Sequence, residues 1–238
     1  MDMSDRIKRF LSYPTAKELP VCLARWSFIH ALVSLLAVAI TLLTHAVLLF
    51  LLIGALSFLL LVPILWPNWT RGDALGFGNA ITALRLAGVF ALSSVYSRMG
   101  SAFVIGFGIV LLGADGLDGW MARRYSQASE FGEYFDKETD AFFLMLLCLL
   151  AFLNERLGAW ILTPGLMRYV FVIVMGFFRP RLLKEQKTDR ARRIYVLMMV
   201  GVFSAFLPYP AFYKPLAGIG TVALIGSFAT DFIWVFKR

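Results

Sequence analysis

Two groups of acidic residues lie in stretches that are otherwise apolar, and their spacing could support chemistry. The first lies in Asp115-Gly-Leu-Asp118-Gly119-Trp-Met-Ala122-Arg123, and the second in Gly132-Glu-Tyr-Phe-Asp136-Lys-Glu-Thr-Asp140. At about 100° per residue, a helical stripe about 100° wide holds Asp115, Asp118, Gly119 and Ala122. A stripe of about 80° on the next helix holds Gly132, Asp136 and Asp140. A short polar turn separates the two helices, so we expect antiparallel neighbours whose four aspartates converge.

Four converging carboxylates repel one another unless cations lie between them. Because no histidine or cysteine lies nearby, the ligand set is all oxygen, which suits Mg²⁺ or Mn²⁺. Two such ions on shared carboxylates are the usual clamp for in-line displacement at phosphorus. Glu138 points about 200° away from Asp136, so we do not expect it to be a ligand. Spacing alone leaves three alternatives open: a calcium loop, a structural ion network and an ion-transport site.

The elements that must position these acids are predicted to be membrane helices. The chain has 238 residues, of which 60% are hydrophobic and 16% charged, whereas soluble domains are roughly 45–50% apolar and about 25% charged. This composition excludes a disordered chain, a fibre and a disulfide-stapled secreted domain. The apolar residues come in long blocks, which indicates an all-α integral membrane protein.

The apolar block 26–66 would be about 60 Å long as one helix, twice a hydrocarbon core of ~30 Å. It is therefore predicted to be two spans that fold back at His45. Further spans are expected near 79–98, 101–123, 133–153, 158–178, 192–209 and 216–236, which makes eight transmembrane helices. The predicted organisation is a basic N-terminal segment 1–25, an accessory hairpin 26–66, a linker 67–78 and a six-helix core 79–238.

The net charge of +8 is carried mainly by the connections between spans. With eight spans, the cations concentrate on the side of both termini, and the opposite loops hold only Arg98, Arg156 and Lys214. By the positive-inside rule, both termini and the acidic cluster face the cytoplasm. The basic balance therefore indicates membrane lipids, and not nucleic acid, as the partner.

The whole acidic pattern, Asp115-x2-Asp118-Gly119-x2-Ala122-Arg123-x8-Gly132-x3-Asp136-x3-Asp140, resembles the signature of the CDP-alcohol phosphotransferase family. The resemblance covers roughly residues 75–238. Asn79-x2-Thr82-x2-Arg85 also resembles the polar stripe that opens the first core helix of that family. The resemblance implies a six-helix core, to which the hairpin 26–66 is an addition.

The resemblance also implies a reaction and a site. Family members use two Mg²⁺ or Mn²⁺ ions to transfer a phosphatidyl or phosphoalcohol group from a CDP-activated donor to a hydroxyl, releasing CMP, and they often form homodimers. Asp115, Asp118 and Asp136 would be the main metal ligands, and Asp140 would complete the site and act as general base. The cytidine and pyrophosphate would be accommodated by Asn79, Thr82, Gly119, Ala122, Arg123 and Gly132.

Basic residues next to this core suggest where an acceptor could bind. Seven cations lie between Arg179 and Arg193, and they serve either topology and anionic lipid or a phosphate on the acceptor. The acceptor-phosphate candidates are Arg168, Lys187, Arg192 and Arg193. Arg168 lies alone in an apolar span and needs an anion, which is either the acceptor phosphate or a core carboxylate.

These observations favour an enzyme of a bacterial inner membrane that transfers phosphatidyl from CDP-diacylglycerol to a polar alcohol. A phosphorylated polyol such as glycerol 3-phosphate or inositol phosphate is the favoured acceptor, because the basic segment suits an anion. Two alternatives stay open: a CDP-aminoalcohol phosphotransferase that acts on diacylglycerol, and a membrane transporter or ion-binding protein that uses the same acids.

Overall fold

The computed structural model describes residues 19–65, 77–124, 129–178 and 189–236. Within these ranges, side chains are described except at 19, 62–65, 77, 95, 97–99, 117–123, 178, 189 and 234–236. Every regular element of this part of the chain is a helix, which confirms the all-α prediction. The elements are α2 (Leu19–Thr44), α3 (Val47–Leu65), α4 (Phe77–Arg124), α5 (Glu130–Leu153), the 3₁₀ turn η2 (Ala159–Ile161), α6 (Leu162–Phe178), α7 (Asp189–Ser204) and α8 (Pro210–Phe236).

The predicted fold-back at His45 is confirmed. His45 adopts a left-handed conformation with φ 56°, which ends α2, and Thr44 Oγ1 donates to Ile40 O at 2.8 Å in its last turn. α2 begins at Leu19, seven residues before the predicted span. Pro20 lies in its first turn, where the missing N–H costs nothing. Residues 19–25 form the start of this helix.

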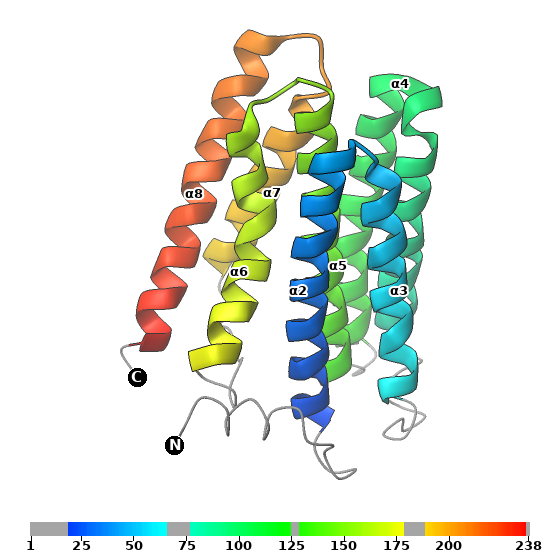
Figure 1. Ribbon diagram of the computed structural model, residues 1–238, viewed down its shortest axis with the longest axis vertical. Helices are drawn as coiled ribbons and strands as arrows, with labels where there is room; N and C mark the ends of the chain where they lie inside the picture. The colour runs from blue at the N-terminus through cyan, green and yellow to red at the C-terminus, as the bar shows by residue number, and fades with distance from the viewer. Residues whose placement is uncertain (1–18, 66–76, 125–128, 179–188, 237–238) are drawn as a thin grey trace.

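Helix α4 consists of two arms that meet at Gly100. This residue has φ 75° and ψ 177°, a conformation that only glycine adopts readily. The arms 77–99 and 101–124 run back along each other, as Figure 1 shows, and the side chain of Leu111 packs on Gly88 across the pair. The arms match the two predicted spans, and their pairing places the start of α4 beside its end.

Helix α5 is the centre of the bundle, and all its residues from 141 to 151 are buried. Phe142 stacks on Phe50 of α3 with ring centroids 4.6 Å apart, and Phe143 meets Phe203 of α7 edge to face at 5.9 Å. In Figure 1, α5 lies behind α2 and between α3 and the α6–α8 side of the bundle. The position of α5 is therefore set by neighbours on several sides.

The connection between α7 and α8 differs from the prediction. The expected spans were 192–209 and 216–236, but α7 ends at Ser204 and α8 begins at Pro210. The ring of Pro210 presets φ for the first helical position, and Tyr209 O accepts from the backbone N–H groups of Phe212 and Tyr213. Pro215 lies inside α8, so this helix begins before the span that was predicted from residue 216.

Three of the described helices are long and apolar enough to cross a membrane: Pro20–Thr44, Ala159–Phe177 and Pro210–Ile233. Val47–Leu61 and Gly100–Gly116 are apolar but shorter. Large apolar side chains are also exposed outside the bundle, for example Leu43 at 83% and Val222 at 72%, as expected where lipid is the solvent. The structure thus supports a membrane protein, while eight crossings stay a prediction.

Candidate active site

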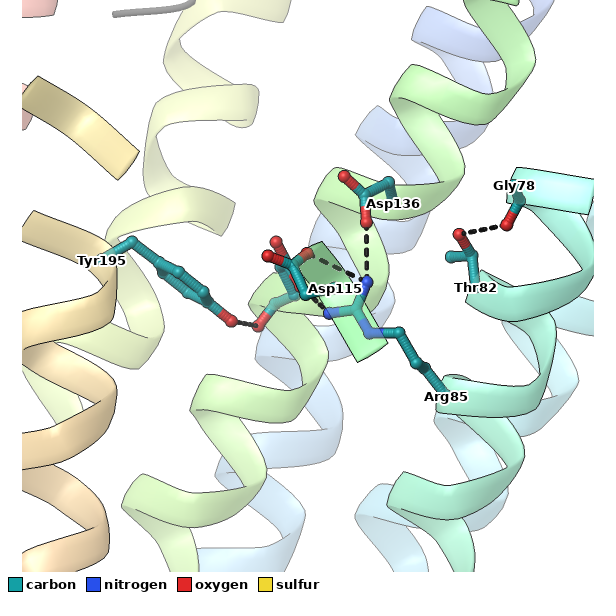
Figure 2. Close-up of polar contacts among 7 residues, drawn as sticks. Gly78, Thr82, Arg85, Asp115, Asp136 and Tyr195 are labelled. Carbon is teal, nitrogen blue, oxygen red and sulfur yellow. Dashed lines mark hydrogen bonds and ion pairs between the residues drawn. The ribbon is translucent and has the colours of Figure 1, made fainter. Parts of the chain in front are cut away.

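Arg85 lies at the centre of the site and joins three of its acids. Its Nη1 lies 3.1 Å from Asp115 Oδ1 and 2.8 Å from Asp136 Oδ1, and its Nη2 lies 2.5 Å from Asp140 Oδ1. Figure 2 shows the guanidinium reaching from the first arm of α4 to the carboxylates. Because the arms pair around Gly100, Arg85 and Asp115 meet although they are distant in sequence.

The three carboxylates converge as the helical stripes predict. One oxygen of each of Asp115, Asp136 and Asp140 lies within 4.8 Å of the other two. The Arg85 side chain is 3% exposed, whereas those of Asp115, Asp140 and Asp136 are 18%, 21% and 38% exposed. The site is therefore closed on the arginine side and most open at Asp136. Three acids against one guanidinium leave an excess of negative charge that favours a further cation.

The donor set fits a divalent metal ion. All three groups are carboxylates, the hard oxygen ligands that Mg²⁺ and Mn²⁺ prefer. Opposite oxygen ligands of Mg²⁺ stand about 4.2 Å apart, so oxygens gathered within 4.8 Å are a small side-chain adjustment away from a coordination sphere. Glu138 lies outside this group, as predicted.

The start of α5 is fixed by its cap and by a close contact with α4. Ser129 is the N-cap, and its Oγ accepts from the backbone N–H of Gly132 at 3.0 Å, which satisfies one of the free donors of the first turn. A Cβ on Gly132 would lie 2.5 Å from Asn79 Oδ1. A larger residue at 132 would displace the Asn79 side chain, and two predicted nucleotide-binding residues thus lie together.

Two further polar groups border the site, as Figure 2 shows. Thr82 is buried, and its hydroxyl donates to Gly78 O one turn earlier in α4, at 3.2 Å. Tyr195 of α7 donates its hydroxyl to the backbone oxygen of Asp140 at 3.4 Å. Helix α7 therefore closes the side of the site opposite the start of α4.

The basic candidates for the acceptor separate into two groups. Arg168 Nη2 donates to Glu138 Oε1 at 2.7 Å, so a core carboxylate supplies the anion that this arginine needs. Arg192 and Arg193 are exposed on α7, and Arg192 Nη2 lies 4.0 Å from the Cβ position of Gly116, next to Asp115. Arg192 therefore lies at the edge of the carboxylate site, beside the residue that follows Asp115.

The remaining predicted site residues lie outside the described side chains. Helix α4 includes the backbone of Asp118, Gly119, Ala122 and Arg123, but their side chains are not described. Lys187 also lies outside the described residues, as do the segments 1–18 and 66–76.

Sequence reasoning did not assign roles to Arg85 or Tyr195. Arg85 belongs to the polar stripe that begins at Asn79, but spacing within one helix does not reveal a partner on the next. The predicted break between spans 79–98 and 101–123 contained the signal, because Arg85 and Asp115 are equally far from Gly100. Tyr195 carried no signal, because a tyrosine in an apolar helix is common at a membrane interface.

Together, these features define a class: all-helical membrane proteins with a partly exposed, oxygen-only carboxylate site suited to divalent cations. A family model described as CDP-alcohol phosphatidyltransferase matches residues 76–232, more than half of the chain. The chain therefore belongs to the CDP-alcohol phosphatidyltransferase family, and it is a transferase of phospholipid synthesis. No significant match was found among curated proteins or solved structures. The family match begins at α4 and leaves out α2 and α3.

Proposed function

We propose that this protein transfers a phosphatidyl group from CDP-diacylglycerol to the hydroxyl of a polar alcohol and releases CMP. A phosphorylated polyol such as glycerol 3-phosphate or inositol phosphate is the proposed acceptor. The observation that carries the proposal is the convergence of Asp115, Asp136 and Asp140 within 4.8 Å, in a chain whose family transfers groups from CDP-alcohols.

The acidic residues would divide into ligands and a base. Asp115, Asp118 and Asp136 would hold two Mg²⁺ or Mn²⁺ ions, with Asp140 completing the set. When bound, these ions would neutralise the pyrophosphate and stabilise negative charge in the transition state. The all-oxygen donor set and its excess negative charge support this assignment.

Asp140 would also act as general base toward the acceptor. Arg85 Nη2 lies 2.5 Å from Asp140 Oδ1, so one oxygen is held and the direction of the carboxylate is fixed. The other oxygen, Oδ2, would accept the proton of the acceptor hydroxyl. The hydroxyl oxygen then forms its bond to the phosphorus that bears the diacylglycerol, and the bond from that phosphorus to the CMP oxygen breaks.

The donor nucleotide would bind where α4 approaches α5. Asn79 and Gly132 are in contact there, and Thr82 lies one turn further into α4. Gly119, Ala122 and Arg123 would complete this binding surface from the end of α4. A wall of small residues leaves room for the cytidine and pyrophosphate beside the metal ligands.

An anionic acceptor would bind on the α7 side. Arg192 lies beside Gly116 at the edge of the site, and Arg193 and Lys187 would extend the positive charge. Arg168 is left out of this proposal, because its guanidinium is paired with Glu138 on the other face of α5.

The proposed location is a bacterial inner membrane, with both termini and the site facing the cytoplasm. The first turn of α2 and the last turn of α8 lie at the same end of the bundle in Figure 1. In the predicted topology, the connections richest in lysine and arginine are on the side of both termini, which supports this orientation.

The test is CMP release by the purified protein in mixed micelles with CDP-diacylglycerol and Mn²⁺. Glycerol 3-phosphate, inositol phosphate, inositol, serine and a blank are compared as acceptors. Release that depends on one phosphorylated polyol is expected. Release only with a CDP-aminoalcohol donor and diacylglycerol would contradict the proposal and favour the alternative enzyme.

Arg192→Gln tests the acceptor side. We expect the KM for the phosphorylated acceptor to rise about tenfold, since one hydrogen bond to a charged group is lost, while the KM for CDP-diacylglycerol stays unchanged. Arg190→Gln is the matched control, because Arg190 lies on the same helix but 3.8 Å from Asp231 of α8. Equal effects of both variants would remove Arg192 from the acceptor site.

A further inference from the structure

Helix α5 carries a fully buried acid, Glu138, on the face opposite the active site. Glu138 lies between Asp136 and Asp140 in sequence, but about 200° from the former around the helix. Its side chain is 0% exposed, whereas Asp136 is 38% exposed. Two faces of one helix therefore hold acids in different surroundings.

Three helices meet at the Glu138 carboxylate. Its Oε1 accepts from Ser27 Oγ of α2 at 2.5 Å and from Arg168 Nη2 of α6 at 2.7 Å. A buried carboxylate needs such partners, because burying it uncompensated is very costly. Any rotation of α5 would separate Glu138 from Ser27, from Arg168 or from both, so these contacts resist rotation.

The α2 contact comes from outside the region that the family model matches. Ser27 lies in the hairpin of α2 and α3, and the match begins at residue 76. The hairpin is itself joined near this point: Trp26 Nε1 donates to Ser57 O at 3.0 Å, and His30 Nδ1 lies 2.8 Å from Ser57 Oγ. The hairpin thus reaches the catalytic helix through Ser27 as one connected unit.

We propose that Glu138 is a positioning residue through which α2 and α6 set the rotation of α5, and thereby place Asp136 and Asp140 for metal binding. At about 5 Å from the helix axis, a rotation of about 10° moves a side chain by about 1 Å. Site geometry must be held more closely than that. The hairpin of α2 and α3 would therefore help to position the metal ligands of the site. This inference rests on the metal site of the proposed function.

Mn²⁺ alone is the probe, and its affinity for the purified full chain in detergent is measured by electron paramagnetic resonance. Glu138→Gln should weaken Mn²⁺ binding about tenfold, as is typical when a group that orients metal ligands is lost. Ser27→Ala should also weaken Mn²⁺ binding, but by less than Glu138→Gln does. Ser27→Thr, which keeps the hydroxyl, should bind Mn²⁺ as the wild type does. Ser34→Ala is the matched control, because Ser34 is also a buried serine of α2.

A double variant separates positioning from general packing. If Ser27 acts through Glu138, Ser27→Ala should weaken Mn²⁺ binding no further in the Glu138→Gln background. If Glu138→Gln does not fold, the comparison of Ser27→Ala with Ser27→Thr and Ser34→Ala decides alone. Equal effects of Ser27→Ala and Ser34→Ala, or a lower melting temperature with unchanged Mn²⁺ affinity, would overturn the inference.

The same preparations separate this inference from the proposed function. CMP release by the wild-type protein tests the function, whereas the Mn²⁺ shifts test the positioning role without turnover. Turnover by the wild type with unchanged Mn²⁺ affinity in the variants would overturn only the inference. Mn²⁺ shifts without any CMP release would support the inference and contradict the function. A wild-type protein that binds no Mn²⁺ would overturn the inference.

Discussion

The two faces of α5 use the same residue types for different ends. On one face, Asp136 and Asp140 meet Asp115 around a single guanidinium, are partly exposed and carry excess negative charge. On the other face, Glu138 is fully buried, and one arginine balances it. An acid–arginine pair inside a membrane bundle is therefore not by itself a functional sign. Charge balance and access distinguish the site that can bind a cation from the contact that holds helices together.

The largest expected effect on stability falls on the Glu138 face of α5, where one acid is balanced by one arginine. Arg168→Met leaves the Glu138 carboxylate buried without its counter-ion, which should lower the free energy of unfolding by about 3–5 kcal/mol. Thermal unfolding in detergent measures it. Glu138→Leu combined with Arg168→Met should recover most of the loss, because an apolar pair needs no desolvation compensation. A single variant as stable as the wild type would contradict the assigned ion pair.

On the face of α5 that carries Asp136 and Asp140, we expect activity to be lost and stability to be kept. Asp136→Asn removes one of several like charges, so the melting temperature should stay the same or rise. CMP release should fall by about 100-fold or more, because charge stabilisation at the phosphorus is lost. Asp231→Asn, which affects the α7–α8 ion pair, is the control that should keep activity. Retained activity in Asp136→Asn would contradict the proposed mechanism.

Part of this contrast is predictable from sequence. The i, i+4 spacing of Asp136 and Asp140 places both on one face, and the intervening two-residue offset sends Glu138 to the other. Neither statement needs tertiary structure, because helix geometry alone determines it. The fold-back at His45 and the two arms around Gly100 are likewise local, since helix length and the hydrocarbon thickness require a turn there.

Apart from the converging aspartates, contacts between helices were beyond that reasoning. Whether Arg168 meets a substrate phosphate or a core carboxylate depends on how α6 is turned against α5, which hydrophobic spacing does not specify. Ser27 gave no signal at all, since a serine inside an apolar helix is common where helices pack closely. The α7–α8 boundary was misplaced because the apolar pattern runs on through 205–209, whereas α7 ends at Ser204 and α8 begins at Pro210.

Arg85→Gln sharpens the charge argument. Without the guanidinium, Asp115, Asp136 and Asp140 face one another, so in EDTA the free energy of unfolding should fall by about 1–3 kcal/mol. Adding Mn²⁺ should then raise the melting temperature more than it does in the wild type, because the ion replaces the missing positive charge. Arg85→Lys, which keeps a cation, should lie between the two. Equal Mn²⁺-induced shifts in wild type and Arg85→Gln would show that Arg85 does not balance the site.

The smallest expected effect tests the contact between the starts of α4 and α5. A Cβ at Gly132 would lie 2.5 Å from Asn79 Oδ1 and 3.3 Å from Ser129 Oγ, so Gly132→Ala should cost about 1 kcal/mol of stability through overpacking. Because Asn79 must turn away, the KM for CDP-diacylglycerol should also rise. Gly106→Ala is the matched control: beyond its chain neighbours and the nearby backbone of its own helix, no described atom lies within 4 Å of its Cβ position, and alanine is the better helix former. Equal stability of the two variants would show that α5 does not need its close approach to Asn79. The face of α5 that carries Asp136 and Asp140 would then tolerate a movement of the helix that the Glu138 face does not.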